Sequence, residues 1–243
     1  MKYLFSIILI SIIFVTPISA KQELKSGDDL VHKMYDKYHT KWYKNLTFKQ
    51  RTIFYKNNEQ VREELWHEAM QIPEGLIIKF GKIKEGNGLL FKNDTMTVFQ
   101  NGEKTSQSRR VHDLLVLGFS IYSDKPEVTI SKLKEVGFDL TKIKTEKIDG
   151  NTYYVVGDPA KKRFWIEAKN LLFTKVETHN SNGSISITEF KDYEKLKKGW
   201  IAPIVNFYLN GEITMKEIYY DIKVPKGLPK NLLEEASFKK MTW

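Results

Sequence analysis

Pairs of turn-forming residues separate short runs of alternating apolar and polar residues along most of this chain. Asp149-Gly150, Asn182-Gly183 and Asn210-Gly211 are pairs of the kind that connect neighbouring antiparallel strands in hairpins. Alternation with a period of two places the apolar side chains of a strand on one of its faces. Because strands joined by such short turns pair with their neighbours in sequence, the pattern predicts an antiparallel meander.

The alternating runs predict about a dozen strands in two groups. The strands of the first group are expected at 46–56, 61–70, 76–80, 89–91 and 95–100. Those of the second group are expected at 141–148, 153–157, 163–168, 171–178, 185–193, 203–209 and 213–224. Neither a linker nor an internal repeat is visible in residues 21–243, so we expect them to form a single domain.

Helical features interrupt the strand pattern at three places. Ser26 is a candidate N-cap, acidic residues follow it in the first turn, and apolar residues then repeat at helical spacing through 30–43. Residues 111–122 are strongly apolar, and Pro126 begins a second short helix that extends to residue 136. A helical turn is expected at 229–236.

These elements predict an α+β fold that is mostly β. A long antiparallel meander twists and curls, and a sheet that stays open needs its concave face covered. The N-terminal helix and the helical insertion are the available cover. We therefore expect a single curled antiparallel sheet with an N-terminal helix and a short helical lid insertion over it.

The apolar residues on one face of the strands and in the insertion leave two interpretations open. They form either an ordinary packed core or the wall of an apolar ligand cavity. A helix that is apolar nearly all round, as expected for the insertion, is either buried or a mobile plug. The candidate lipid-binding residues are Leu76, Ile78, Phe80, Met96, Val98, Leu114, Leu115, Leu117, Phe119, Phe164 and Ile166.

Residues 1–20 have the features of a secretory signal peptide. Lys2 is the single charged residue, an apolar run follows from Leu4 to Val15, and the segment ends on Ser19-Ala20. That run is shorter than the roughly 20 residues that cross a bilayer as a helix. We expect cleavage after Ala20 and export of the mature chain.

Cysteine is absent from the 243 residues. This excludes a disulfide scaffold, a thiol nucleophile and a cysteine metal site. It also excludes a lipid anchor of the lipoprotein type, which needs a cysteine at the cleavage point. The exported chain is therefore expected to be free of a lipid anchor.

The chain carries 39 basic and 30 acidic residues, a net charge of +9. Its lysines are spread singly or in pairs along the whole chain, which favours a solvated outer face. The alternative is attraction to an anionic membrane surface or a polyanion. No nucleic-acid recognition motif is present, so we expect no nucleic-acid partner.

The motifs of common enzymes are incomplete in this chain. His67-Glu68 begins a zinc-peptidase pattern, but Gln71 stands where the second histidine is required. Glu63 and Glu64 point to opposite faces of a predicted strand, so they cannot act together as an acid–base pair. The histidines are scattered without ligand spacing. We expect no catalytic residues, no metal site and no cofactor.

Several local patterns resemble LolA, the periplasmic carrier of outer-membrane lipoproteins, and the wider group of outer-membrane lipoprotein-sorting proteins. Residues 46–50 (LTFKQ) resemble the aromatic-x-x-Gln first strand of these proteins. Residues 93–99 (NDTMTVF) resemble one of their hairpins, and residues 164–167 (FWIE) resemble a late strand. Residues 190–193 and 200–203 look like the longer sorting proteins.

The resemblance implies an unclosed β-barrel that holds acyl chains under helical lids. It implies a periplasmic carrier whose partner is a lipid or an acylated lipoprotein, with a role in lipoprotein sorting. The lipoprotein carrier has an arginine just before a proline, which holds its lid shut, whereas this chain has Ala69-Met70-Gln71-Ile72-Pro73. The alternative is a non-enzymatic sensing or protein-binding module on the same scaffold, in contact with a membrane surface or an envelope protein.

Overall fold

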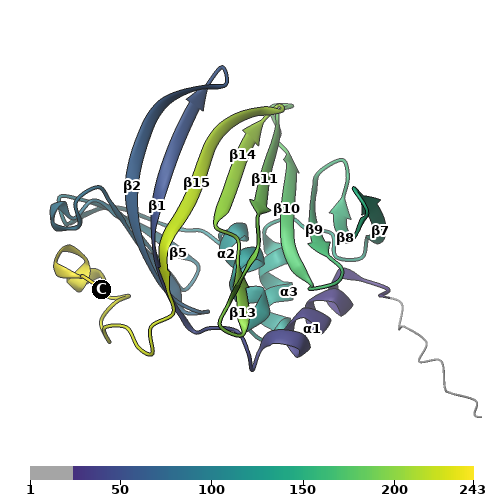
Figure 1. Ribbon diagram of the computed structural model, residues 1–243, viewed down its shortest axis with the longest axis horizontal. Coiled ribbons are helices and arrows are strands. Elements are labelled where there is room, and N and C mark those ends of the chain that lie inside the picture. The colour runs from purple at the N-terminus through teal and green to yellow at the C-terminus, as the bar shows by residue number, and fades with distance from the viewer. Residues whose placement is uncertain (1–23) are drawn as a thin grey trace, which may run out of the picture.

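The computed structural model describes residues 24–243, so the expected signal peptide at 1–20 lies outside the described residues. A 13-stranded antiparallel sheet makes up most of the fold and curls into an open half-barrel (Figure 1). The strands, in their spatial order, are β6 (Glu103–Arg109), β5 (Thr95–Gln100), β4 (Gly88–Lys92), β3 (Gly75–Phe80), β2 (Glu59–Gln71), β1 (Asn45–Lys56), β15 (Glu212–Lys223), β14 (Ile204–Leu209), β11 (Ile185–Lys191), β10 (Leu172–His179), β9 (Lys162–Glu167), β8 (Asn151–Asp158) and β7 (Ile143–Ile148).

The last long strands of the chain join the two halves of the sheet. β1 pairs with β2 on one side and with β15 on the other, and β14 connects β15 to β11. The first and second groups of strands are therefore one continuous sheet. The sheet ends at β6 and β7, so it is not closed into a barrel, and the expected fold class is confirmed.

Every strand expected from the alternating runs is present, and three further strands are not predicted by alternation. β6 has the sequence EKTSQSR, in which every residue is exposed. A strand at the edge of a sheet can be polar on both faces, and its charges oppose pairing with another chain. The other two, β12 (Glu194–Leu196) and β13 (Gly199–Ile201), form a small separate hairpin.

The N-terminal helix α1 (Gly27–Tyr38) begins at the expected cap. The Ser26 side chain accepts a hydrogen bond from the Asp29 backbone N–H, and the Asp29 carboxylate accepts one from the Ser26 backbone N–H. This reciprocal pair is a capping box. Leu30, Val31 and Met34 are buried on the face that packs against the core. The helix ends at Tyr38, earlier than the apolar repeat through 43 suggests.

The helical insertion lies between β6 and β7 in sequence and on the concave side of the sheet (Figure 1). It consists of α2 (Asp113–Gly118), a 3₁₀ turn η2 (Ser120–Tyr122) and α3 (Pro126–Glu135). The strongly apolar segment is thus not one helix, because it breaks at Phe119, whose backbone angles are φ −134° and ψ −59°. None of the helices in residues 24–243 has the length and apolar character needed to cross a bilayer.

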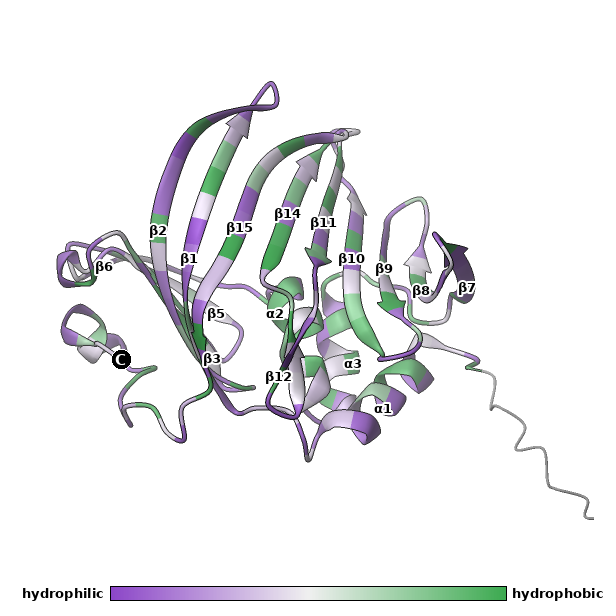
Figure 2. Cartoon of the chain, viewed as in Figure 1, coloured by the Kyte–Doolittle hydropathy of each residue, from purple (hydrophilic) through white to green (hydrophobic). Residues whose placement is uncertain are grey.

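Apolar side chains fill two separate clusters, one on each face of the sheet. Apolar and polar residues alternate along the strands (Figure 2). The larger cluster lies on the concave side and joins the sheet to α1 and the insertion. The smaller one lies on the other face of β2 to β5, where Ala69, Ile77, Leu90 and Phe99 pack under the C-terminal residues.

We call residues 228–243 the C-terminal strap. It contains the short 3₁₀ helix η3 (Glu235–Lys240), and another short 3₁₀ helix, η1 (Ile83–Glu85), lies between β3 and β4. Leu232, Leu233 and Phe238 of the strap are buried against the sheet. The helical turn expected at 229–236 is therefore part of a longer segment that covers the sheet from outside.

Candidate functional site

The candidate residues predicted on strands all point to the concave face. In an antiparallel pair, residues directly opposite each other share a face. Leu76 lies opposite Phe91, which in turn lies opposite Met96; Ile78 lies opposite Leu89, and Leu89 opposite Val98. Phe80 lies opposite Trp66, and Phe164 and Ile166 belong to the concave cluster. The alternation therefore identified the correct face.

A cavity of about 230 Å³ lies between this face and the insertion. Among the predicted residues, Leu76, Ile78, Leu114, Leu115 and Phe119 line it. Its other lining residues come from β2, β4, β11, β14, β15 and the start of the insertion, and they are Trp66, Glu68, Met70, Leu89, Phe91, His112, Phe190, Val205, Phe207, Met215, Glu217 and Tyr219.

The remaining predicted residues do not line this cavity. Leu117, Phe164 and Ile166 are fully buried in the packed part of the concave cluster. Phe80 and Met96 are partly buried and pack against that cluster, while Val98 is partly exposed on the same face. The concave face thus combines a packed core with a cavity.

The helix α2 covers the cavity and approaches β11 closely. A Cβ atom at Gly118 would lie 2.8 Å from Cε1 of Phe190, so only glycine permits this approach without a shift. The cavity volume of about 230 Å³ is below the roughly 300–1,000 Å³ of typical ligand pockets. An acyl chain of ordinary length would therefore require α2 to move outward.

A polar row crosses the otherwise apolar concave face, and sequence reasoning missed it. Gln50 and Thr52 on β1 are buried, and the Gln50 amide donates to the Thr52 hydroxyl at 2.7 Å. On β15, the Tyr219 hydroxyl donates to the Glu217 carboxylate at 2.9 Å. Glu68 of β2 is 5% exposed and lines the cavity. The sequence did contain a signal for this row, because Glu68 alternates in phase with the apolar Trp66 and Met70 and is therefore placed on the same face of the strand.

Both glutamates have pKa values above the ordinary range. Burial raises the pKa of Glu217 to about 7, although the hydrogen bonds from Tyr219 and Gln50 favour the ionised form. Burial raises the pKa of Glu68 well above its usual value, and the charge of Glu217 raises it further. The cavity therefore holds carboxyl groups that remain protonated to a higher pH than surface glutamates.

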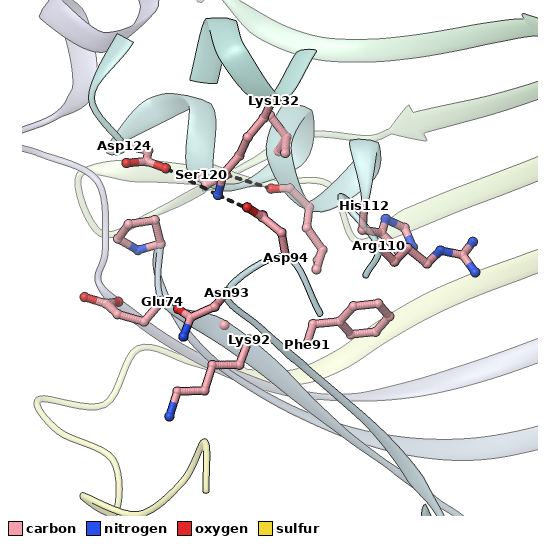
Figure 3. Close-up of a pocket in the computed structure, with 14 residues that line it drawn as sticks. Glu74, Phe91, Lys92, Asn93, Asp94, Arg110, His112, Ser120, Asp124 and Lys132 are labelled. Carbon is pink, nitrogen blue, oxygen red and sulfur yellow. Dashed lines mark hydrogen bonds and ion pairs between the residues drawn. The ribbon is translucent and has the colours of Figure 1, made fainter. Parts of the chain in front are cut away.

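A second cavity of about 240 Å³ (Figure 3) shares the lining residues Phe91, His112 and Leu115 with the first one. Its wall is polar. Lys132 of α3 lies 3.0 Å from the Asp94 carboxylate in the β4–β5 turn and 3.9 Å from that of Asp124. The pair with Asp94 connects the insertion to the sheet, and the pair with Asp124 lies within the insertion.

His112 lines both cavities and precedes α2. Burial lowers the pKa of His112, and its Nδ1 has no hydrogen-bond partner among the described residues. Its ring is nearly perpendicular to that of Phe91, with 5.3 Å between the ring centroids. His112 is thus part of both cavity walls, and its surroundings favour the neutral imidazole.

The tract that departs from the lipoprotein carriers lies directly at the insertion. Gln71, Ile72 and Pro73 line a small cavity of about 40 Å³ together with Leu115 and Phe119. The position where the resemblance implies a lid-holding arginine therefore lies at the insertion in this chain, without a guanidinium group. The ion pair between Lys132 and Asp94 connects the insertion to the sheet.

The incomplete zinc motif is extended in the structure. His67 and Glu68 are neighbours on β2, so their side chains point to opposite faces of the sheet. Within residues 24–243, no group of three or more His, Asp or Glu side chains is arranged to hold a metal ion.

No protein-family model matches the chain, and no curated protein is similar to it in sequence. Solved structures share its fold. A domain of an outer membrane lipoprotein-sorting protein from Vibrio parahaemolyticus aligns over 88% of this chain and 98% of its own, with a TM-score of 0.60 and 16% identity. A LolA superfamily protein from Nitrosomonas europaea aligns over 86% and 97%, with a TM-score of 0.55 and 15% identity.

A DUF1329 family protein from Desulfovibrio piger is similar to the same extent. It aligns over 87% of this chain and 97% of its own, with a TM-score of 0.61 and 14% identity. At these identities the similarity is one of fold. The chain has a LolA-like fold, as the resemblance of its local patterns implied.

Proposed function

We propose that this protein is a periplasmic carrier that holds a lipid, or the acyl chains of a lipoprotein, in the cavity beneath α2. The observation that carries the proposal is the cavity itself, which is lined mostly by apolar side chains of the concave face and of the insertion. A cavity of this kind is what a carrier with a LolA-like fold needs. Outer membrane lipoprotein sorting is the process in which we place it.

Two further observations support the proposal. The Vibrio domain of the same fold is named for outer membrane lipoprotein sorting. The first twenty residues of this chain have the features of an export signal, which would deliver it to the compartment where such carriers act. The helix α2 would then act as the lid, which moves outward to admit a chain.

The proposal is tested with the mature protein, residues 21–243, purified without detergent. We expect lipid to be released on solvent extraction and detected by mass spectrometry, and we expect a fluorescent fatty acid to bind. Leu89→Trp places a larger side chain in the cavity, so it should weaken binding of the fluorescent fatty acid about tenfold.

Leu209→Trp is the matched control. Leu209 is 42% exposed at the end of β14 and lies outside the cavity lining, so its replacement should leave binding unchanged. A protein that contains no lipid and binds no fatty acid would contradict the proposal. Equal binding by wild type and Leu89→Trp would place the ligand elsewhere on the molecule.

A further inference from the structure

The Glu68 carboxyl group in the cavity wall has no hydrogen-bond partner among the described residues. Glu68 is 5% exposed and lines the cavity, and burial raises its pKa without an opposing hydrogen bond. A buried carboxyl without a partner loses the free energy of its hydration. Because Glu68 lines the cavity, a molecule that occupies the cavity can supply the missing donor.

The side chains around Glu68 are suited to an organic cation. Register places Glu68 opposite Phe48 on β1 and Ile78 on β3, and Trp66 and Met70 flank it on the same face of β2. Aromatic faces such as that of Trp66 attract cations, and the neighbouring apolar side chains would contact a hydrocarbon chain. An inorganic cation would find too few oxygen ligands here.

The charge inside the cavity is opposite to that of the whole chain. The acidic residues of the lining are Glu68 and Glu217, and none of the described residues that line the cavity is Lys or Arg. The whole chain nevertheless carries +9. An anionic head group would meet two carboxyl groups and no Lys or Arg side chain in this lining, whereas a cation would balance the carboxyl groups.

We propose that the Glu68 carboxyl, with Glu217 nearby on the same cavity wall, binds a protonated amine attached to an apolar chain. This inference rests on the proposed function, because the apolar chain would occupy the cavity beneath α2. The amine would donate to the Glu68 carboxylate, which forms as the carboxyl group releases its proton to solvent when the cation binds. The raised pKa values of both glutamates agree with this, since each carboxyl lacks a positive partner in the unliganded protein.

The test compares three probes of equal chain length, which are decylamine, decanol and decanoate, by isothermal titration calorimetry at pH 7.5. We expect decylamine to bind about tenfold or more tightly than decanol, because a charge-assisted hydrogen bond exceeds a neutral one. Decanoate should bind most weakly. In Glu68→Gln, decylamine should fall to the affinity of decanol.

Two controls separate the head-group effect from loss of the fold. Decanol should bind Glu68→Gln as it binds wild type, which shows that the cavity is intact. Glu59→Gln replaces an exposed glutamate at the far end of β2 and should retain the preference for decylamine. Glu217→Gln offers a second variant, in which the preference for decylamine should be reduced.

The outcomes distinguish this inference from the proposed function. If none of the probes binds wild type, the apolar-carrier function itself fails. If decanol or decanoate binds as tightly as decylamine, the cavity holds chains but the amine site is wrong. A preference for decylamine that persists in Glu68→Gln would also overturn the assignment.

Discussion

Glu68 and Glu217 occupy strand positions at which the alternation turns their side chains toward the concave face. At each of them an apolar residue would satisfy the pattern of the neighbouring positions. In the structure both lie in a polar row with Gln50, Thr52 and Tyr219 on the concave face. Polar residues at core-facing positions of otherwise regular strands are where function is expected.

Glu217 should make the stability of the protein depend on pH. Its folded-state pKa of about 7 is above the ordinary glutamate value of 4.5, so its contribution to stability is complete below pH 4.5. That contribution is lost as the pH rises through about 7, because the native state then has to ionise a buried carboxyl.

Glu217→Gln mimics the protonated form and should remove this loss. The variant and wild type should be similarly stable at pH 5. Near pH 8, the free energy of unfolding of the variant should exceed that of wild type by about 1–3 kcal/mol. Urea denaturation at both pH values measures this. A constant difference across the range would show that Glu217 ionises normally in the folded protein.

At the scale of elements, the strands follow from local alternation and the insertion does not. Residues 111–122 are strongly apolar, and this composition favours burial without specifying one helix or two. The break at Phe119 allows α2 to cover the cavity while η2 contacts α1. Tyr122 of η2 is fully buried, and its hydroxyl accepts a hydrogen bond from the backbone N–H of Phe173.

The contact of α2 with β11 predicts the effect of a larger side chain at Gly118. In Gly118→Val, the added atoms would overlap the ring of Phe190, which is 2.8 Å from an ideal Cβ. We expect a loss of about 1–3 kcal/mol in the free energy of unfolding, despite the higher helix propensity of valine. Urea denaturation measures this loss.

Gly227→Val is the control for that substitution. A Cβ atom at Gly227 meets no atom within 4 Å, so this variant should retain the stability of wild type. Equal stability of Gly118→Val and wild type would mean that α2 shifts outward without cost. That result would indicate that α2 is held only weakly against β11.

At the scale of the whole molecule, the C-terminal strap covers the outer face of one half of the sheet. Phe238 stacks on Phe99 of β5, with 3.8 Å between the ring centroids and 6° between the planes. Lys79 of β3 is fully buried beneath the strap, where its ammonium group donates to the Phe238 carbonyl and lies 3.9 Å from the ring centroid. Burial lowers the pKa of Lys79 to about 8.

Phe238→Ala should therefore destabilise the protein by about 3–5 kcal/mol, since it removes a fully buried aromatic ring and uncovers a buried cation. Thermal unfolding measures the effect. Tyr220→Ala removes an aromatic ring that is 39% exposed on β15 and should cost far less. Similar losses in the two variants would show that the strap contributes little to the stability of the sheet.

The sequence by itself determined the strands, their concave face and the start of α1. These features depend on side-chain alternation, on turn residues and on a local capping box, so nearby residues are sufficient to specify them. The same local patterns carried the resemblance that the LolA-like fold confirmed. Leu76 and Ile78 could be assigned to the cavity face for this reason.

Only the tertiary structure decided the pairing of β15 with β1, the position of the strap and the division of the concave face into core and cavity. Each depends on contacts between residues far apart in the chain, for which periodicity carries no signal. The edge strand β6 was missed because an exposed edge imposes no apolar alternation. Glu68 became a candidate binding residue because the fold surrounds it with apolar side chains and leaves its carboxyl without a partner among the described residues.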